Sequence, residues 1–107
     1  MTHQVPKIIL AQLGGNRFLA MTGAYSLTGS KDTLSMRLPV KSTKDGIGGV
    51  RITLDPNDTY TLTAIKLAGS FAKGNVRVVE AFKESGIYCD MLAETFTEAT
   101  GLYTSIG

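Results

Sequence analysis

Residues 50–67 read VRITLDPNDTYTLTAIKL, and this stretch decides the fold because it contains two alternating segments joined by a turn. Apolar residues occupy every second position before the turn, at Val50, Ile52 and Leu54, and again after it, at Tyr60, Leu62 and Ala64. Such alternation is typical of strands with one buried face, and the intervening Asp-Pro-Asn-Asp has turn chemistry. We predict an antiparallel hairpin, with a bulge near Ala64–Ile65, where the apolar positions change parity.

Further strands are predicted on both sides of this hairpin. Residues 33–38 alternate most cleanly, with Leu34, Met36 and Leu38 on one side, and Pro39 ends the strand. Phe18–Thr22 is interpreted as a strand that Tyr25 and Leu27 extend, residues 40–48 as a polar loop, and Asn75–Phe82 as the last strand. The connections are too short for helical crossovers, so about five strands form a largely antiparallel sheet.

Helices are predicted at both ends of the chain. Residues 4–13 have apolar positions at helical spacing and are followed by Gly14 and Gly15, which end the helix. A second helix begins with Ser85 as its N-cap, presents one apolar stripe, and stops at Gly101. That stripe consists of Tyr88, Met91, Leu92, Phe96 and Ala99.

The fold class that follows is α+β in two layers: an antiparallel sheet of about five strands, with N- and C-terminal helices packed on one face. The expected core comprises Ile8, Ile9, Leu13, Leu34, Met36, Leu38, Val50, Ile52, Leu54, Leu62, Val78, Met91, Leu92 and Phe96. A chain of 107 residues is the length of a single domain, residues 1–107. The chain has 43% hydrophobic and 19% charged residues. This composition argues against both a disordered chain and a coiled coil.

Composition also limits the setting and the chemistry. One cysteine excludes an internal disulfide and a multi-cysteine metal site, which favours a reducing compartment. No apolar run approaches the roughly 20 residues that cross a bilayer, and the N-terminus lacks the pattern of a signal peptide. We therefore expect a cytoplasmic protein without a membrane partner. The net charge of +2 does not by itself require a nucleic-acid partner.

The sheet face opposite the helices is the strongest candidate for a site. Its expected side chains are hydroxyls and arginines without a carboxylate, namely Thr33, Ser35, Arg37, Arg51, Thr53, Thr61 and Thr63, and Arg77 is a further candidate. Arginines and hydroxyls bind the nucleic-acid backbone, although stacking aromatics are not evident there, and the same residues suit an ordinary solvated sheet face. The predicted phosphate contacts are Arg37, Arg51 and Arg77, assisted by Lys41, Lys44 and Lys73, although nearby aspartates dilute this positive charge.

Other motifs predict no catalytic or metal site. The glycines at 23–31 and 46–49 lack the helix that must follow a phosphate-binding loop, so we interpret them as turns. Asp55–Asp58 begins like a calcium loop but has Tyr60 and Lys66 where glycine and glutamate are required. A catalytic cysteine needs a histidine, and the only one is His3 near the N-terminus, so Cys89 is expected to be a packed thiol. We expect a protein that is not an enzyme and needs no cofactor or metal.

Several segments resemble a family of small uncharacterised proteins encoded by bacteriophages, prophages and conjugative elements. They are QLGGNRFLAMTGA at 12–24, VRITL at 50–54 with Tyr60, GIYCDML at 86–92, and Phe96 with TGLYT at 100–104. The resemblance extends over almost the whole chain at the same spacing. It implies a mobile genetic element acting inside a bacterial cell, but it assigns no activity and no site residue.

The function expected from these observations is non-catalytic binding, with a preference for the nucleic-acid backbone. The alternative is a protein inhibitor that binds and blocks a host defence complex, in the manner of an anti-CRISPR protein. An enzyme is the third possibility, and a ligand pocket beside Cys89 would favour it. Exposed sheet edges also suggest a homodimer, in which residues 103–107 add a strand to a neighbour.

Overall fold

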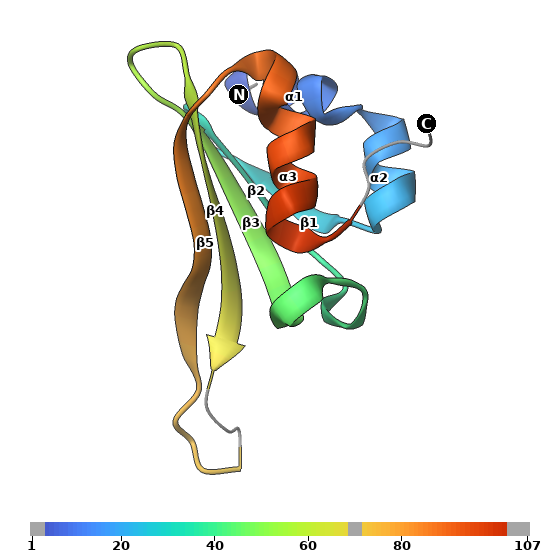
Figure 1. Cartoon of the computed structure of the whole chain (residues 1–107), viewed down its shortest axis with the longest axis vertical. Helices are drawn as coiled ribbons and strands as arrows, with labels where there is room; N and C mark the ends of the chain where they lie inside the picture. Colours follow the sequence, from blue (N-terminus) through green and yellow to red (C-terminus); the bar gives the residue numbers. More distant parts are fainter. Residues whose placement is uncertain (1–3, 69–71, 103–107) are drawn as a thin grey trace.

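A five-stranded antiparallel sheet carries three helices on one of its faces (Figure 1). The structure is a computed structural model that describes residues 4–68 and 72–102. The strands lie in the sheet in the order in which they occur in the chain: β1 Tyr25–Gly29, β2 Thr33–Arg37, β3 Ile47–Leu54, β4 Tyr60–Ala68 and β5 Arg77–Ile87. The predicted two-layer α+β class, with its antiparallel sheet, is therefore confirmed.

The helical layer is formed by both ends of the chain. Its α-helices are α1 Gln4–Leu13, α2 Asn16–Thr22 and α3 Leu92–Thr100. Three short 3₁₀ helices join the elements: η1 Val40–Ser42, η2 Lys44–Gly46 and η3 Cys89–Met91. The predicted first helix is confirmed with its bounds, and Gly101 ends α3 in the left-handed conformation expected of a C-cap.

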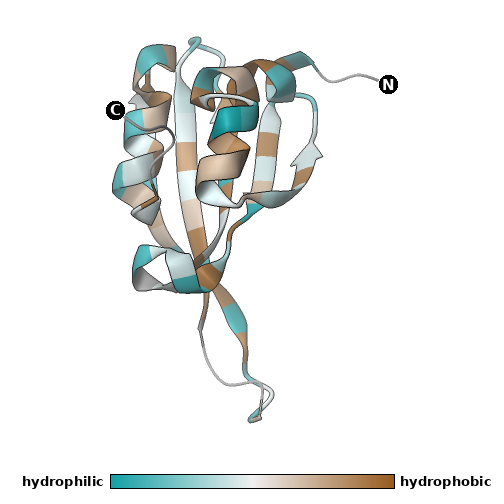
Figure 2. Ribbon diagram, turned by 90° about the vertical axis from the view of Figure 1, so that its right-hand side faces the viewer, coloured by the Kyte–Doolittle hydropathy of each residue, from teal (hydrophilic) through white to brown (hydrophobic). Residues whose placement is uncertain are grey.

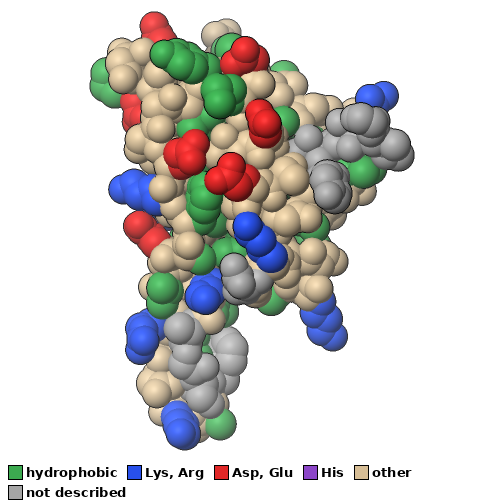
Figure 3. All heavy atoms as spheres, in the orientation of Figure 1, with side chains coloured by type: hydrophobic (Ala, Val, Ile, Leu, Met, Phe, Trp, Pro, Cys, Tyr) green, Lys and Arg blue, Asp and Glu red, His purple; other side chains and the backbone are tan. Residues whose placement is uncertain are grey.

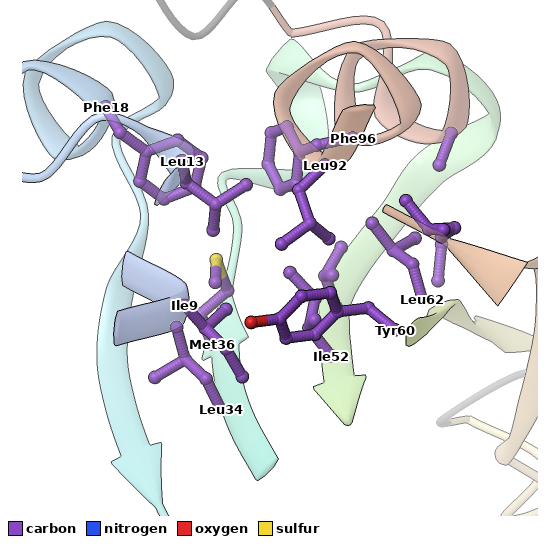
Figure 4. Close-up of a cluster of buried hydrophobic side chains, with 14 of the residues drawn as sticks. Ile9, Leu13, Phe18, Leu34, Met36, Ile52, Tyr60, Leu62, Leu92 and Phe96 are labelled. Atoms are coloured by element: carbon purple, nitrogen blue, oxygen red, sulfur yellow. The ribbon is translucent and has the colours of Figure 1, made fainter. Parts of the chain in front are cut away.

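Strand register explains where the core lies. Leu34, Ile52 and Leu62 are direct neighbours across β2, β3 and β4, and Met36, Val50 and Ala64 form the next row. All six are buried, and they face Ile9 and Leu13 of α1 and Leu92 and Phe96 of α3 (Figure 4). The strands consequently show alternating apolar and polar bands (Figure 2). The β4–β5 register does shift between Ala64 and Ile65, as predicted, but the extra residue lies in β5, so β4 keeps its alternation and the predicted change of parity was wrong.

The segment Phe18–Thr22 is a helix, so its prediction as a strand was wrong. In α2, Phe18 is fully buried, and its ring packs edge-on against Phe96 of α3, with 4.9 Å between ring centroids. A short apolar run fits a strand or a buried helix equally well, and here tertiary packing decides. The strand expected in this region is β1 alone, which begins at Tyr25.

Helices α2 and α3 end in the same way, and the sequence repeats the motif. Residues 18–24 read FLAMTGA and residues 96–102 read FTEATGL, so both contain Phe-x-x-x-Thr-Gly. In each helix the buried threonine hydroxyl donates to the phenylalanine carbonyl at 2.8 Å and accepts from the backbone N–H that follows the glycine at 3.2 Å. The glycines, Gly23 and Gly101, take left-handed conformations. The motif thus provides both hydrogen bonds of a buried hydroxyl, and its glycine ends the helix.

The start of the C-terminal helix also differs from its prediction. Strand β5 continues through Ser85 and Gly86 to Ile87, which is buried, so Ser85 is not an N-cap. The chain then passes through η3 before α3 begins at Leu92. As a result Tyr88 and Met91 lie outside the core and are exposed.

Two other residues assigned to the core are also exposed. Ile8 lies on α1 beside Ile9, but the buried face of that helix is centred on Ile9 and Leu13. Val78 pairs with Leu67 near the end of the β4–β5 hairpin, and both side chains lie on the uncovered face of the sheet. The predicted role of the tail, residues 103–107, lies outside the described residues.

Candidate nucleic-acid interface

The uncovered face of the sheet holds two of the predicted arginines together. Arg51 pairs with Ser35, which lies two residues before Arg37 on β2. Since side chains two residues apart in a strand share a face, Arg37 and Arg51 point to the same side. Their strand neighbours Met36 and Val50 are buried beneath the helices, so the arginines face away from the helical layer.

At the turn end of this face, the hydroxyls are already paired. Thr33 and Thr53 lie 3.0 Å apart through their Oγ1 atoms. The Oγ1 atom of Thr61 lies 2.6 Å from Asp55 Oδ2 and 3.1 Å from Ser85 Oγ. The expectation of a face without carboxylates was therefore wrong, because Asp55 of the turn bonds to Thr61 and Glu80 of β5 pairs with Ile65 on the same face. The hydroxyls of Thr33, Thr53 and Thr61 thus already have partners within the protein, which leaves the other end of the face as the candidate site.

That other end is hollowed. A cavity of about 460 Å³ lies on it and is lined from all five strands, by residues that include Tyr25, Arg37, Gly49, Arg51, Leu67 and Val78. Gly49 pairs with Arg37 on one side and Ile65 on the other. A Cβ atom at Gly49 would lie only 3.1 Å from Ile65 Cγ1, so glycine is what allows Ile65 to lie across the floor of the hollow.

An exposed aromatic side chain lies beside the arginines, and the sequence interpretation missed it. Tyr25 pairs directly with Arg37 and is 50% exposed. It begins β1 immediately before an irregularity, in which Ser26 has φ 52° and the β1–β2 register shifts. A bulge of this kind redirects the side chains around it. The sequence interpretation missed Tyr25 because it assigned residues 18–22 to a strand and treated Tyr25 as a continuation of that strand, so the residue was not assigned to a face of the sheet.

The two guanidinium groups have no partner in the part of the chain that the structure describes. Neither Arg37 nor Arg51 forms an ion pair or a side-chain hydrogen bond with residues 4–68 or 72–102. Both side chains are exposed. Their donors are thus available to a ligand, and Arg37 and Arg51 are diagonal neighbours across β2 and β3, which puts them roughly 7–8 Å apart.

Of the remaining predicted cations, Arg77 and Lys44 do not share this face, and Lys41 and Lys73 lie outside the strands. Arg77 precedes Val78 in β5, and because Val78 lies at the hollow, Arg77 points to the opposite side. Lys44 lies against the C-terminal end of α3, where a Cβ atom at Gly101 would be 3.4 Å from Lys44 Cβ. Lys41 in η1 and Lys73 in the turn at 72–74 are exposed in loops. The structure thus brings together Arg37 and Arg51 but not the other four.

Charge is nevertheless distributed unevenly along the molecule. On the helical side, acidic side chains gather over and beside α3, whereas lysines and arginines gather toward the projecting β4–β5 end (Figure 3). The hollow lies toward that same end, since its residues Leu67 and Val78 belong to it. The hollow therefore lies at the end of the molecule toward which the cations visible on the helical side gather.

Other candidate sites in the molecule offer less. Cys89 is exposed in η3, so its prediction as a packed thiol was wrong. Within residues 4–68 and 72–102, no three His, Cys, Asp or Glu side chains lie close enough together to hold a metal ion. None of the described helices has the length and apolar character to cross a membrane.

Comparison with known proteins adds no relative: no protein-family model, curated protein or solved structure matches this chain. The resemblance to proteins of mobile genetic elements therefore stays a prediction.

Proposed function

We propose that the protein binds nucleic acid, without catalysis, through the hollowed end of its uncovered sheet face. The observation that carries this proposal is the pair of guanidinium groups of Arg37 and Arg51, which have no partner among the described residues and lie beside a half-exposed tyrosine. Guanidinium groups bind phosphate through paired hydrogen bonds, and they supply most of the affinity for a polyanion. Lys41 and Lys73, exposed in loops, are auxiliary contacts in this proposal.

The proposal includes a setting inside a bacterial cell, on a mobile genetic element. Its support is the resemblance of residues 12–24 and 86–92 to proteins of such elements. Exposed arginines on one face are suited to a nucleic-acid partner, because they attract a polyanion.

Salt-dependent binding tests this function. Fluorescence anisotropy with labelled single-stranded and duplex 20-mers is measured over a range of salt concentrations, for the wild type and for Arg37→Ala/Arg51→Ala. Each phosphate contact contributes about 0.7–0.9 to the slope of log K against log salt, so we expect the double variant to lower that slope by about 1.4–1.8.

The matched control is Lys7→Ala/Arg17→Ala, which removes the same charge from exposed positions on α1 and α2. It should keep a slope close to that of the wild type, because these residues lie on the helical side. If no DNA or RNA binds at low salt, or if both double variants lose binding equally, the proposal is wrong.

A protein partner is the second candidate, and the apolar rim of the hollow favours it. Val40, Leu67 and Val78 are all exposed there. A cluster of exposed apolar side chains is typical of protein contact surfaces. This candidate, an inhibitor that blocks a host defence complex, requires affinity capture from bacterial lysate to recover a stoichiometric protein that nuclease treatment does not release.

A further inference from the structure

We propose that the hollow holds an unpaired base stacked on Tyr25, so that the protein recognises single-stranded nucleic acid rather than duplex. This inference rests on the proposed function and adds the class of nucleic acid to it. It names a base-binding site as well as a phosphate-binding one.

The surface of the hollow is suited to a base. Tyr25 supplies a half-exposed aromatic ring, and Ile65, Leu67 and Val78 supply apolar side chains. Stacking of bases on aromatic rings is a principal source of affinity in single-strand binding, and it needs no particular base. A duplex keeps its bases stacked inside and offers phosphates outside, so the apolar side chains of the hollow would gain nothing from it.

The positions of the cations fit a strand that crosses the hollow. Arg37 is the direct neighbour of Tyr25, and Arg51 lies diagonally from Arg37 across the next strand. A base on Tyr25 therefore brings its own phosphate close to one guanidinium and an adjacent phosphate close to the other. Because neither arginine is engaged by another described residue, no internal ion pair has to break before binding.

The hollow also has the size and floor that a base requires. Its volume of about 460 Å³ lies within the roughly 300–1,000 Å³ of small-ligand clefts. Gly49 keeps the floor clear of a side chain between Arg37 and Ile65, where even a Cβ atom would crowd Ile65. Apolar side chains beside an aromatic ring are suited to a planar, largely apolar ligand such as a base.

The test compares three labelled 20-mers: an intact single strand of DNA, the same strand with abasic sites throughout, and the duplex. The abasic strand keeps the phosphates but has no bases to stack. We expect the wild type to bind the intact single strand more tightly than either of the others. The same comparison with RNA strands shows whether the protein prefers single-stranded DNA or single-stranded RNA.

The variant Tyr25→Leu removes the ring and keeps an apolar side chain. It should lower affinity for the intact strand about 5- to 100-fold, while the salt slope and the affinity for the abasic strand stay unchanged. Tyr88→Leu is the matched control, because Tyr88 is 63% exposed but follows β5 at the opposite end of the sheet. It should bind as the wild type does.

A second readout does not depend on the variant folding. The protein has four tyrosines and no tryptophan, so its intrinsic emission reports tyrosine. The intact strand should quench that emission and the abasic strand should not.

The outcomes separate the two proposals. Equal binding of intact and abasic strands, tighter binding of duplex, or wild-type affinity in Tyr25→Leu overturns the base site while nucleic-acid binding stands. If no strand binds, both proposals fail, and nuclease-resistant capture of a protein would then assign the hollow to a protein partner.

Discussion

Tyr60 begins β4, and its side chain is buried beneath the helical layer. Burial raises the pKa of this tyrosine above its ordinary value of 10.0. A side-chain hydrogen bond with Gln12 acts in the opposite direction, and the charges of Cys89 and Asp58 add to the rise. The Oε1 atom of Gln12 is itself buried and has no hydrogen-bond partner among the described residues. The native state thus favours the protonated tyrosine.

A prediction about alkaline stability follows. Below pH 10 the tyrosine is protonated in both states, but above it the unfolded chain loses the proton while the folded chain keeps it, so the free energy of unfolding falls. Tyr60→Phe should reduce that fall, as measured by urea unfolding between pH 8 and pH 11. Tyr88→Phe, at an exposed tyrosine, should behave as the wild type. If the free energy of unfolding depends on pH in the same way in all three proteins, the raised pKa of Tyr60 does not cause the loss of stability.

At the scale of elements, the paired ends of α2 and α3 hold the helical layer together. Each helix ends with Phe-x-x-x-Thr-Gly, and the two phenylalanine rings meet at an interplanar angle of 73°. Helix α2 has only seven residues, too few to be stable alone. Its stability therefore comes from burying Phe18 against Phe96.

Truncating this ring tests the contact. Phe18→Ala should destabilise the protein by about 3–5 kcal/mol, the usual cost of deleting a buried phenylalanine side chain. Met21→Ala on the same helix is the control, because Met21 is exposed and its loss should change stability by less than about 1 kcal/mol. Denaturant unfolding measures both variants. Similar losses in the two would show that α2 does not depend on Phe18.

The elements that sequence predicted well are those with a clear period. Residues 33–37, 50–54 and 60–64 alternate regularly, and α1 has helical spacing followed by two glycines, so the sequence identified these strands and this helix. Helix α2 has fewer than two turns over which to show a period, although its shared Phe-x-x-x-Thr-Gly motif was a usable signal. Ser85 and Gly86 have the composition of a helix start, yet they continue β5.

The sequence could predict the candidate site only where it could predict the face of the sheet to which each side chain points. The regular β2–β3 register let the sequence place Arg37 and Arg51 on one face. Between β4 and β5 the register shifts twice, and each shift reverses the side to which residues of β5 point relative to a regular ladder. Arg77 was therefore not assignable to a face from sequence. Tyr25 lay beyond an irregular register in β1 and was missed for a similar reason.

At the scale of the whole molecule, the sheet is longer than the layer that covers it. The molecule measures 41 × 32 × 27 Å, and the β4–β5 hairpin projects past the helices (Figure 1). Leu67 and Val78 in this projecting part are exposed, whereas Ile52 and Leu62 beneath the helices are fully buried. Protection from solvent therefore differs along the same strands.

Hydrogen exchange measures this difference. The backbone amides of Lys66 and Val79, near the uncovered end, should exchange faster than those of Ile52 and Leu62, because local opening there exposes little apolar surface. Peptide-resolved mass spectrometry at neutral pH distinguishes the two regions. Equal protection throughout β3, β4 and β5 would contradict the expectation.

The order of the strands in the sheet has a consequence for how the chain folds. Because each strand pairs with the next one along the chain, every pairing closes only a short loop, and the entropy lost at each step is small. Every strand pairing in the sheet can thus form between segments that are near neighbours in the sequence. Contacts between α1 and α3 bring together segments from near the two ends of the sequence, so closing them costs more chain entropy than closing any of the strand pairings.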